Sequence, residues 1–252
     1  MEWREKEGVR CLRAELDGAT AAFSTRLGGV SESPYDSLNL GLLTDDAPAA
    51  VVENRRRLAA ALGFEPEQIV IARQVHGTRL IEHPSPSRGS FGTAYVQKEP
   101  RDGLPEADGH VVREPGLAPL VFTADCLPVA VAGPRGVAML HAGWRGLAGG
   151  ILAAGAEAVE ASSAAIGPGI GPCCYEVGEE VLGAFADLGD GIAEGRMLDL
   201  PEVARRLLAR AGVERIESAG LCTSCEEELF FSHRRDAGRT GRQGGIAWLE
   251  GA

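Results

Sequence analysis

Five short apolar runs constrain the fold of this chain most. Taken together they are rich in β-branched residues, and Gly, Pro or Asp bounds them, which is the pattern of strands buried in a sheet. The runs cover residues 21–24, 69–72, 119–123, 129–132 and 137–140. Because the last three follow one another almost without interruption, we expect them to pair as a hairpin or a meander.

Helical patterns alternate with these runs. We expect one helix over residues 47–62, where Gly63 provides the stop. A second is expected over 200–211, where Asp199 and Glu202 have capping-box spacing and a glycine follows the last turn. The alternation of strands and helices predicts an α/β (α+β) fold.

The rest of the chain offers fewer signals. Residues 147–160 and 179–187 are two further expected helices, and the Pro/Ser/Gly-rich stretch 83–93 is expected to be a loop. No internal repeat and no shift in composition marks a boundary. Residues 1–252 are therefore expected to form a single domain.

The composition excludes several classes of protein. The 252 residues are 44% hydrophobic and 24% charged, as is ordinary for a soluble globular protein. No stretch approaches the roughly 18 apolar residues of a membrane span, and the charged start lacks the apolar core of a signal peptide. We expect a cytoplasmic protein with no membrane partner, and the net charge of −11 disfavours nucleic acid as a partner. In that compartment the six cysteines are expected to be free thiols.

Two histidines and one cysteine stand where predicted strands end. His76, Cys126 and His141 each follow one of the apolar runs. Side chains at strand ends are held by a rigid sheet yet face its open rim, where active sites usually form. Two imidazoles and a thiolate can hold a catalytic Zn²⁺ and leave a fourth position for water or substrate. Their spacing matches no local zinc motif, so a merely packed role stays open.

The same three residues permit two other chemistries. Cys126 could act as a nucleophile with His141 as its base, which requires a lowered thiol pKa and no metal on the sulfur. A blue-copper site also uses two His and one Cys, typically with a weak Met ligand, and the chain offers only Met1, Met139 and Met197. Five histidines without a His-X-His pair cannot furnish several copper centres, so copper is the least favoured of the three.

Arginines cluster near the end of the chain. Four of them fall within nine residues, among glycines: Arg234, Arg235, Arg239 and Arg242. Guanidinium groups bind phosphate bidentately, and glycines let backbone N–H groups approach the same anion. In an acidic chain this pattern indicates a site for a small anion, and a solvated loop paired with acidic neighbours is the plain alternative. Arg26 and Arg145 are further candidates for that role.

Two aspartates carry weaker signals. Asp108 precedes a glycine and Asp125 precedes Cys126. Either carboxylate could orient a ligand histidine or move a proton, although Asp before Gly is most often part of a turn.

Four of the cysteines are arranged in two pairs. Cys222 and Cys225 have the spacing of redox and zinc motifs, but no second Cys-X-X-Cys accompanies them. Cys173 and Cys174 are adjacent. We interpret all four as buried or idle thiols.

Considered together, the motifs of this chain resemble the YfiH family, also described as laccase-domain or multicopper polyphenol oxidase proteins, as purine nucleoside phosphorylases and as peptidoglycan-editing factors. The resemblance covers about residues 20–249, and the motifs arrive in order. They include Ser24-Thr25-Arg26, Asn39-Leu40-Gly41, Gln74-Val75-His76-Gly77, Ala107-Asp108-Gly109, Thr123-Ala124-Asp125-Cys126, His141-Ala142-Gly143-Trp144-Arg145-Gly146, Cys174-Tyr175-Glu176-Val177-Gly178, Phe231-Ser232-His233-Arg234-Arg235 and Thr240-Gly241-Arg242-Gln243. His233 departs from the family, which often has Tyr there.

The resemblance implies a fold, a metal and an activity. The fold is a single α/β/β/α layered domain with mixed sheets, similar to the catalytic domain of cytotoxic necrotizing factors. His76, Cys126 and His141 are implied to be the metal ligands, usually of zinc. The implied activity is phosphorolysis of adenosine, inosine, guanosine and methylthioadenosine to free base and pentose 1-phosphate, together with adenosine deamination.

Together, the residue patterns and the resemblance predict a zinc-assisted purine nucleoside phosphorylase with adenosine deaminase side activity. The predicted catalytic residues are Cys126, His141, Asp125 and Asp108. The residues predicted to bind nucleoside or phosphate are Arg26, Asn39, Arg145, Arg234, Arg235 and Arg242. The His-X-Glu and Pro-Cys-X-X-Cys motifs of common zinc deaminases are absent, so one of the two aspartates would move the proton.

Three rival functions stay open at this point. One is a cysteine hydrolase that edits peptidoglycan precursors, with Cys126 as nucleophile. Another is a copper-dependent polyphenol oxidase, and a third is a metal-stabilised binding protein without turnover.

Overall fold

The computed structural model describes residues 1–84 and 103–251, so most of the loop expected over 83–93 lies outside the described residues. The helices are α1 (Pro48–Leu62), α2 (Trp144–Gly149), α3 (Ile151–Val159), α4 (Glu179–Gly183) and α5 (Leu200–Arg210), with 3₁₀ turns at Pro66–Gln68 and Ala186–Leu188. The strands are β1 (Glu2–Lys6), β2 (Val9–Leu16), β3 (Ala19–Ser24), β4 (Ile69–Val70), β5 (Leu80–His83), β6 (Gly109–Val112), β7 (Ala118–Thr123), β8 (Leu127–Gly133), β9 (Gly136–Ala142), β10 (Ser163–Ile166), β11 (Ala193–Glu194), β12 (Met197–Leu198), β13 (Arg215–Ser218) and β14 (Gln243–Leu249).

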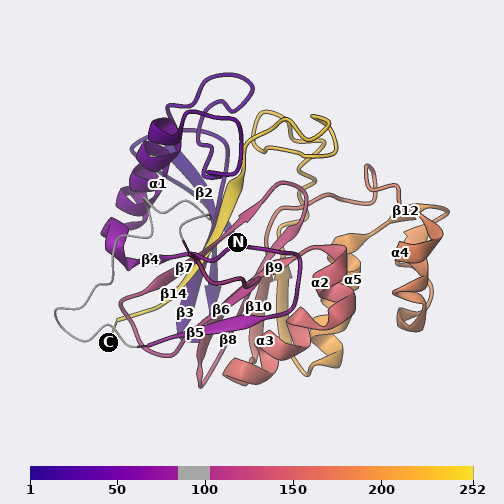
Figure 1. Cartoon of the computed structure of the whole chain (residues 1–252). Coiled ribbons are helices and arrows are strands. Elements are labelled where there is room, and N and C mark those ends of the chain that lie inside the picture. The colour runs from indigo at the N-terminus through magenta and orange to yellow at the C-terminus, as the bar shows by residue number, and fades with distance from the viewer. Residues whose placement is uncertain (85–102, 252) are drawn as a thin grey trace.

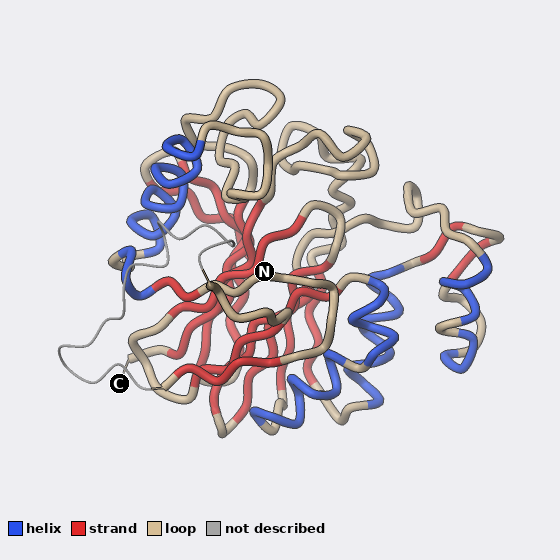
Figure 2. The backbone as a smooth tube through the Cα atoms, viewed as in Figure 1, coloured by secondary structure: helices blue, strands red, loops and turns tan. Residues whose placement is uncertain are grey.

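Most of these strands belong to two six-stranded sheets (Figure 2). The strand order is β1-β2-β3-β14-β7-β4 in the first sheet and β13-β10-β8-β9-β6-β5 in the second. Both sheets are mixed: β4 runs parallel to β7, and β5 runs parallel to β6, while the central neighbours are antiparallel. A small third sheet pairs β11 with β12.

The alternation of side chains along the central strands produces four layers. In β9, Val137 and Met139 pack between the sheets, whereas Ala138 and Leu140 pack against the helices on the far side. Helix α1 covers the outer face of the first sheet through residues such as Leu58, and α3 and α5 cover the outer face of the second (Figure 1). This arrangement confirms the predicted layered fold with mixed sheets.

All five predicted strands are present, with shifted ends, but the pairing differs from the expectation. β8 and β9 form the antiparallel hairpin, with Val129 opposite Leu140. β7 belongs to the other sheet, where it pairs with β14 and β4. Residues 124–126 therefore carry the chain from one sheet to the other. A run of apolar residues predicts a buried strand but not the sheet that it joins.

Two helices follow the sequence closely. Gly63 ends α1 in a left-handed conformation (φ 85°) and donates to the carbonyls of the last turn, as predicted. The side chain of Asp199 caps α5 by accepting the N–H of Glu202 at 2.9 Å. The Glu202 carboxylate does not complete the capping box, because it pairs with two arginines one turn further along the helix.

The prediction of one helix over 147–160 is wrong. Gly150, with φ 92°, ends α2 and begins α3, so the chain turns between two short helices. The helix expected over 179–187 is also shorter: α4 ends at Gly183, and a 3₁₀ turn follows it. In the described part of the chain no helix is long and apolar enough to cross a membrane.

Candidate active site

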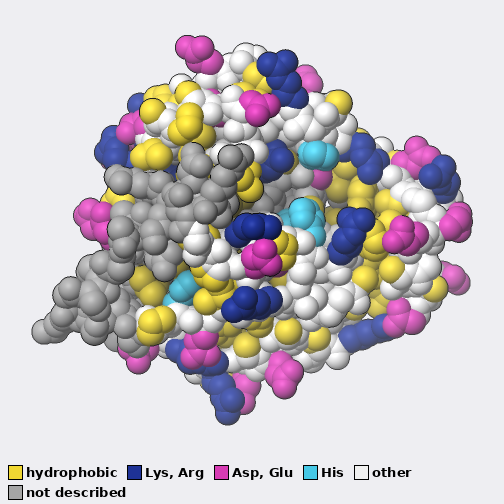
Figure 3. Space-filling model, in the orientation of Figure 1, with side chains coloured by type: hydrophobic (Ala, Val, Ile, Leu, Met, Phe, Trp, Pro, Cys, Tyr) yellow, Lys and Arg dark blue, Asp and Glu magenta, His cyan; other side chains and the backbone are white. Residues whose placement is uncertain are grey.

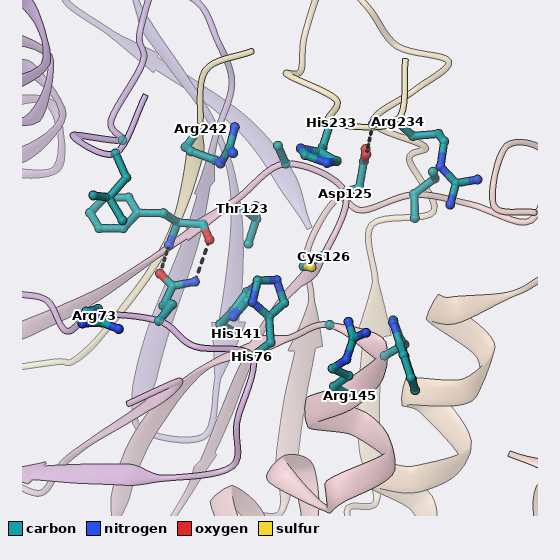
Figure 4. Close-up of a pocket in the computed structure, with 18 of the residues that line it drawn as sticks. Arg73, His76, Thr123, Asp125, Cys126, His141, Arg145, His233, Arg234 and Arg242 are labelled. Atoms are coloured by element: carbon teal, nitrogen blue, oxygen red, sulfur yellow. Dashed lines mark hydrogen bonds between the residues drawn. The ribbon is translucent and has the colours of Figure 1, made fainter. Parts of the chain in front are cut away.

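Three segments bring His76, Cys126 and His141 together at the seam between the two sheets. His76 lies in the loop after β4, Cys126 lies where the chain passes from β7 to β8, and His141 lies near the end of β9. Their ligand atoms are all within 4.8 Å of one another. The two imidazole rings meet edge to face with their centroids 4.8 Å apart, and Figure 4 shows both beside the Cys126 sulfur.

Backbone geometry allows this close approach. His76 (φ 60°) and Asp125 (φ 87°) both have left-handed backbone, which few non-glycine residues adopt and which is concentrated at functional sites. Gly143 follows β9, and a Cβ atom there would lie 3.0 Å from the Cys126 sulfur and 3.2 Å from the His76 ring. A side chain at this position would therefore push against both Cys126 and His76.

Asp108 holds both histidines. This fully buried carboxylate accepts the backbone N–H groups of Val75, His76 and Gly77 at 2.7–3.1 Å, and it lies 2.8 Å from Nδ1 of His141. An ionised carboxylate only accepts hydrogen bonds, so Nδ1 of His141 carries a proton and Nε2 is the ring nitrogen left for Cys126 or for a metal ion. Burial by itself raises the pKa of Asp108, but the hydrogen bonds from His141 and Gly77 outweigh it and lower that pKa. Four bonds occupy both oxygens, which favours a positioning role over proton transfer.

Cys126 and His141 favour each other's charged form. Burial alone would raise the pKa of the Cys126 thiol, but the His141 charge and hydrogen bonds from both imidazoles lower it to about 6. Burial likewise opposes a charged His141, yet the Cys126 thiolate and the Asp108 hydrogen bond raise its pKa to about 9. A thiolate therefore forms easily at the centre of the site.

Asp125 lies at the crossing between the sheets and borders the cavity. Its carboxylate accepts the hydroxyl of Thr223 and the backbone N–H of Arg234, both at 2.7 Å, and its carbonyl accepts the N–H of Ile170 at 2.8 Å. These bonds fix the crossing segment against two later loops. Unlike Asp108, Asp125 is among the residues that line the cavity.

The three residues open onto a cavity of about 480 Å³, within the usual range for small-molecule sites. Trp144, Tyr175 and Phe122 supply aromatic surface to its wall, whereas Phe230 and Phe231 are fully buried in the core. The charged residues among the lining are Arg55, Arg73, Arg145, Arg234 and Arg242, with Asp125 as the acidic one. A basic cavity in a chain of net charge −11 is suited to an anion. Figure 3 shows histidine and basic side chains gathered on this face.

Three of the predicted substrate-binding residues border this cavity. Arg145 stacks on Trp144 and is otherwise exposed. Arg234 donates to the carbonyl of Glu176 at 2.9 Å, and Arg242 donates to two carbonyls of its own loop. Figure 4 shows these three arginines around the His76, Cys126 and His141 side chains.

The structure places the other three away from the cavity lining. Arg26 donates to the carbonyls of Asp36 and Glu227 and stacks on a phenylalanine. Arg235 forms a two-pronged pair with Asp236 and donates to three carbonyls. Asn39 is fully buried, and its side-chain oxygen Oδ1 accepts the backbone N–H of Arg242 at 2.9 Å. These side chains brace the loops that carry the cavity.

Arg55 and Gln74 are functional candidates that sequence reasoning missed. Arg55 lies in α1 one turn after Val51 and one turn before Ala59, both of which are buried. This spacing could have predicted from the sequence that Arg55 lies on the buried face of the helix. It stacks on Phe122, and burial lowers its pKa to about 9. The Gln74 side chain bonds to both the N–H and the carbonyl of Phe122 at 2.7–2.8 Å, which ties the loop of His76 to β7.

The prediction of burial is wrong for two of the four remaining cysteines. Cys173 and Cys225 are exposed, and all six cysteines of the chain are free thiols. The sulfurs of Cys173, Cys174, Cys222 and Cys225 lie within 4.8 Å of one another, so the two pairs meet.

Residues 20–250 match the family model described as "Multi-copper polyphenol oxidoreductase laccase". The chain is 42% identical over 246 residues to the "Purine nucleoside phosphorylase YfiH" of Shigella flexneri, with 92% of this chain and 94% of that protein covered. It is 39% identical to the "Purine nucleoside phosphorylase YlmD" of Geobacillus stearothermophilus, covering 93% and 91%. The crystal structure of the Bacillus licheniformis hypothetical protein YfiH superimposes with a TM-score of 0.86 at 34% identity, over 98% of this chain and 99% of that one.

Proposed function

The chain belongs to the YfiH family, and the family model that it matches is described as multi-copper polyphenol oxidoreductase laccase. From this membership we propose that the chain is a purine nucleoside phosphorylase. The reaction joins inorganic phosphate to C1′ of a purine nucleoside and breaks the bond from C1′ to the base. The products are the free base and a pentose 1-phosphate. The proposed substrates are adenosine, inosine, guanosine and methylthioadenosine, with adenosine deamination as a side activity.

The observation that carries the proposal is the charge of the cavity. Five arginines and one aspartate line it, beside the His76, Cys126 and His141 side chains. Among the interactions of the described residues, Arg145 makes no hydrogen bond or ion pair, so its guanidinium is available to a phosphate. Burial keeps Arg242 poorly solvated at the cavity wall, and a nearby anion would compensate for that burial.

The nucleoside is assigned to the aromatic part of the same cavity. Trp144 and Tyr175 offer flat apolar surface for a purine, and the arginines hold phosphate on the sugar side. Phosphorolysis passes through a transition state with positive charge at C1′, which an adjacent phosphate dianion stabilises. The arginines orient that dianion for attack.

The residues of the site fit a zinc ion. Two imidazoles and a thiolate are common zinc donors, and Asp108 orients His141 in the way that carboxylates orient zinc-bound histidines. We assign His76, Cys126 and His141 as the ligands. When bound, zinc would supply a Lewis acid that polarises the departing base or lowers the pKa of a water molecule. The donor set disfavours blue copper, because none of the three methionines lines the cavity.

Proton transfer is assigned to Asp125. It borders the cavity and has one hydrogen-bond partner at each carboxylate oxygen, whereas Asp108 does not line the cavity and has two partners at each oxygen. Asp125 would deliver a proton to the departing base, or to the ammonia that leaves in deamination. The residues 1–252 are proposed to act as one catalytic domain, because both sheets contribute to the site.

The experiment is a product assay on purified protein supplied with adenosine, with and without phosphate. Base and pentose 1-phosphate should appear only when phosphate is present. Equal base release in both samples would remove phosphorolysis. The variant Arg145→Ala should need a higher phosphate concentration for the same rate of base release, and Arg56→Ala is the matched control because Arg56 is an exposed α1 residue paired with Glu53.

One observation supports a second candidate function. The pKa of Cys126 is lowered to about 6 beside a histidine that a carboxylate orients, as in a cysteine hydrolase. This candidate predicts an acyl-thioester on Cys126 after incubation with a peptidoglycan precursor. Alkylation of Cys126 that zinc fully prevents, with no trapped acyl group, would support ligation instead.

A further inference from the structure

A second group of four cysteines lies outside the active site. Cys173 and Cys174 sit in one turn, and Cys222 and Cys225 sit in another. The sulfur of Cys225 is 3.3 Å from that of Cys173 and 3.5 Å from that of Cys174. We propose that these four thiolates bind one structural zinc ion.

Hydrogen bonds of the backbone bring the two turns together. Gly169 and Cys222 form a parallel bridge, in which the N–H of Thr223 donates to the carbonyl of Gly169 at 3.0 Å. The N–H of Gly171 donates to the sulfur of Cys222 at 3.2 Å. Such N–H···S bonds stabilise a thiolate that ligates a metal. The site is therefore held by the fold before any ion enters.

The distances suit one tetrahedral ion. A zinc–sulfur bond of about 2.3 Å places the sulfurs of a regular tetrahedron about 3.8 Å apart. The four sulfurs here lie within 4.8 Å of one another, and Cys225 lies 3.3 Å from Cys173 and 3.5 Å from Cys174. Side-chain rotations that shift each sulfur by less than about 1 Å would close the cage.

Four thiolates leave no position for substrate, which is the pattern of structural rather than catalytic zinc. The group shares no residue with the His76, Cys126 and His141 set. Two of its members, Cys173 and Cys225, are exposed, so an ion can reach the sulfurs from solvent. In addition, Arg235 donates to the carbonyls of Thr223 and Ser224, which helps to fix the turn that carries Cys222 and Cys225.

The site would brace one wall of the active-site cavity. Tyr175 follows Cys174 directly and lines the cavity. Thr223 follows Cys222, and its hydroxyl donates to Asp125 at 2.7 Å. An ion that joins the two turns would hold Tyr175 and Asp125 in a fixed relation, without touching the substrate.

The first test counts zinc in the full-length protein after dialysis. In the background Cys126→Ala, which removes a ligand of the active-site set, about one zinc ion per chain should stay bound. The further double change Cys173→Ser and Cys225→Ser should abolish that binding. The control is Cys11→Ala in the same background, because Cys11 is buried in the core outside both sets. Loss of all zinc in Cys126→Ala alone would overturn the proposal, and so would retention of zinc in the double serine variant.

The second test needs no variant. With zinc bound, the exposed Cys173 and Cys225 should react slowly with a thiol reagent in the native protein, and a strong chelator should make them react at least tenfold faster, with release of zinc. Cobalt in place of zinc should give the visible bands of a tetrahedral tetrathiolate complex. A disulfide between these cysteines in protein purified under argon, or a red protein with iron on the four sulfurs, would overturn the assignment.

Discussion

Replacing Asp108 by Asn keeps the size of the side chain but turns one of its two oxygens into an NH₂ group. In the native protein, Oδ1 of Asp108 accepts from the backbone of His76 and from His141, and Oδ2 accepts from the backbone of Val75 and Gly77. Whichever way the amide is turned, two N–H donors at a buried position face another donor. The change therefore isolates the acceptor role of this carboxylate.

The magnitude follows from those two donors. Each buried N–H group without an acceptor costs about 1–3 kcal/mol, so Asp108→Asn should lower the free energy of unfolding by about 2–6 kcal/mol. Loss of the group that orients His141 should also weaken zinc binding about 10- to 100-fold. Urea unfolding of the metal-free protein measures the first effect, and a competition titration with a zinc chelator measures the second.

A matched substitution controls for the chemistry of the change. Asp199→Asn alters the N-cap of α5, where asparagine caps as well as aspartate, so its stability should stay close to wild type. If Asp108→Asn unfolded at the same urea concentration as Asp199→Asn and bound zinc as tightly as wild type, the organising role of Asp108 would be refuted.

Three further outcomes are expected. Arg145→Ala should raise the KM for phosphate about 10- to 100-fold, the value of a hydrogen bond to a charged group, without a change in unfolding free energy; an unchanged KM would remove Arg145 from the phosphate site. Gly150→Ala should cost about 1–2 kcal/mol because φ is 92° there, whereas Gly183→Ala, in α4 with open space around it, should not destabilise, and equal melting temperatures for the two variants would contradict this account. Removal of zinc by a strong chelator should lower the melting temperature and stop base release, and added zinc should restore both; base release that persists without metal would contradict a zinc-assisted reaction.

The layered fold was predictable where local pattern and packing agree. The runs that became β8 and β9 are continuously apolar because both faces of the second sheet are covered, one by the first sheet and one by helices. The stops at Gly63 and Gly212 are local backbone effects and were predictable from residue type. The crossing of the chain to the other sheet after β7 was not predictable. It depends on the left-handed backbone of Asp125, and nothing in the neighbouring sequence indicates that conformation.

The candidate site divides in the same way. His76, Cys126 and His141 were predictable as a group because strand ends from a layered fold converge at a rim. The directions of the arginine side chains were not, since neighbours such as Arg234 and Arg235 diverge, one toward the cavity and the other toward Asp236. The meeting of the two cysteine pairs was equally hidden, because it depends on a bridge between turns about fifty residues apart in sequence.

The passage of the chain from one sheet to the other has a consequence for assembly. The donors come from separate layers, so an intermediate in which each sheet has formed but the two have not docked would possess every ligand and no binding site. Zinc affinity therefore reports whether the two sheets have docked, and only molecules with docked sheets can carry out the reaction.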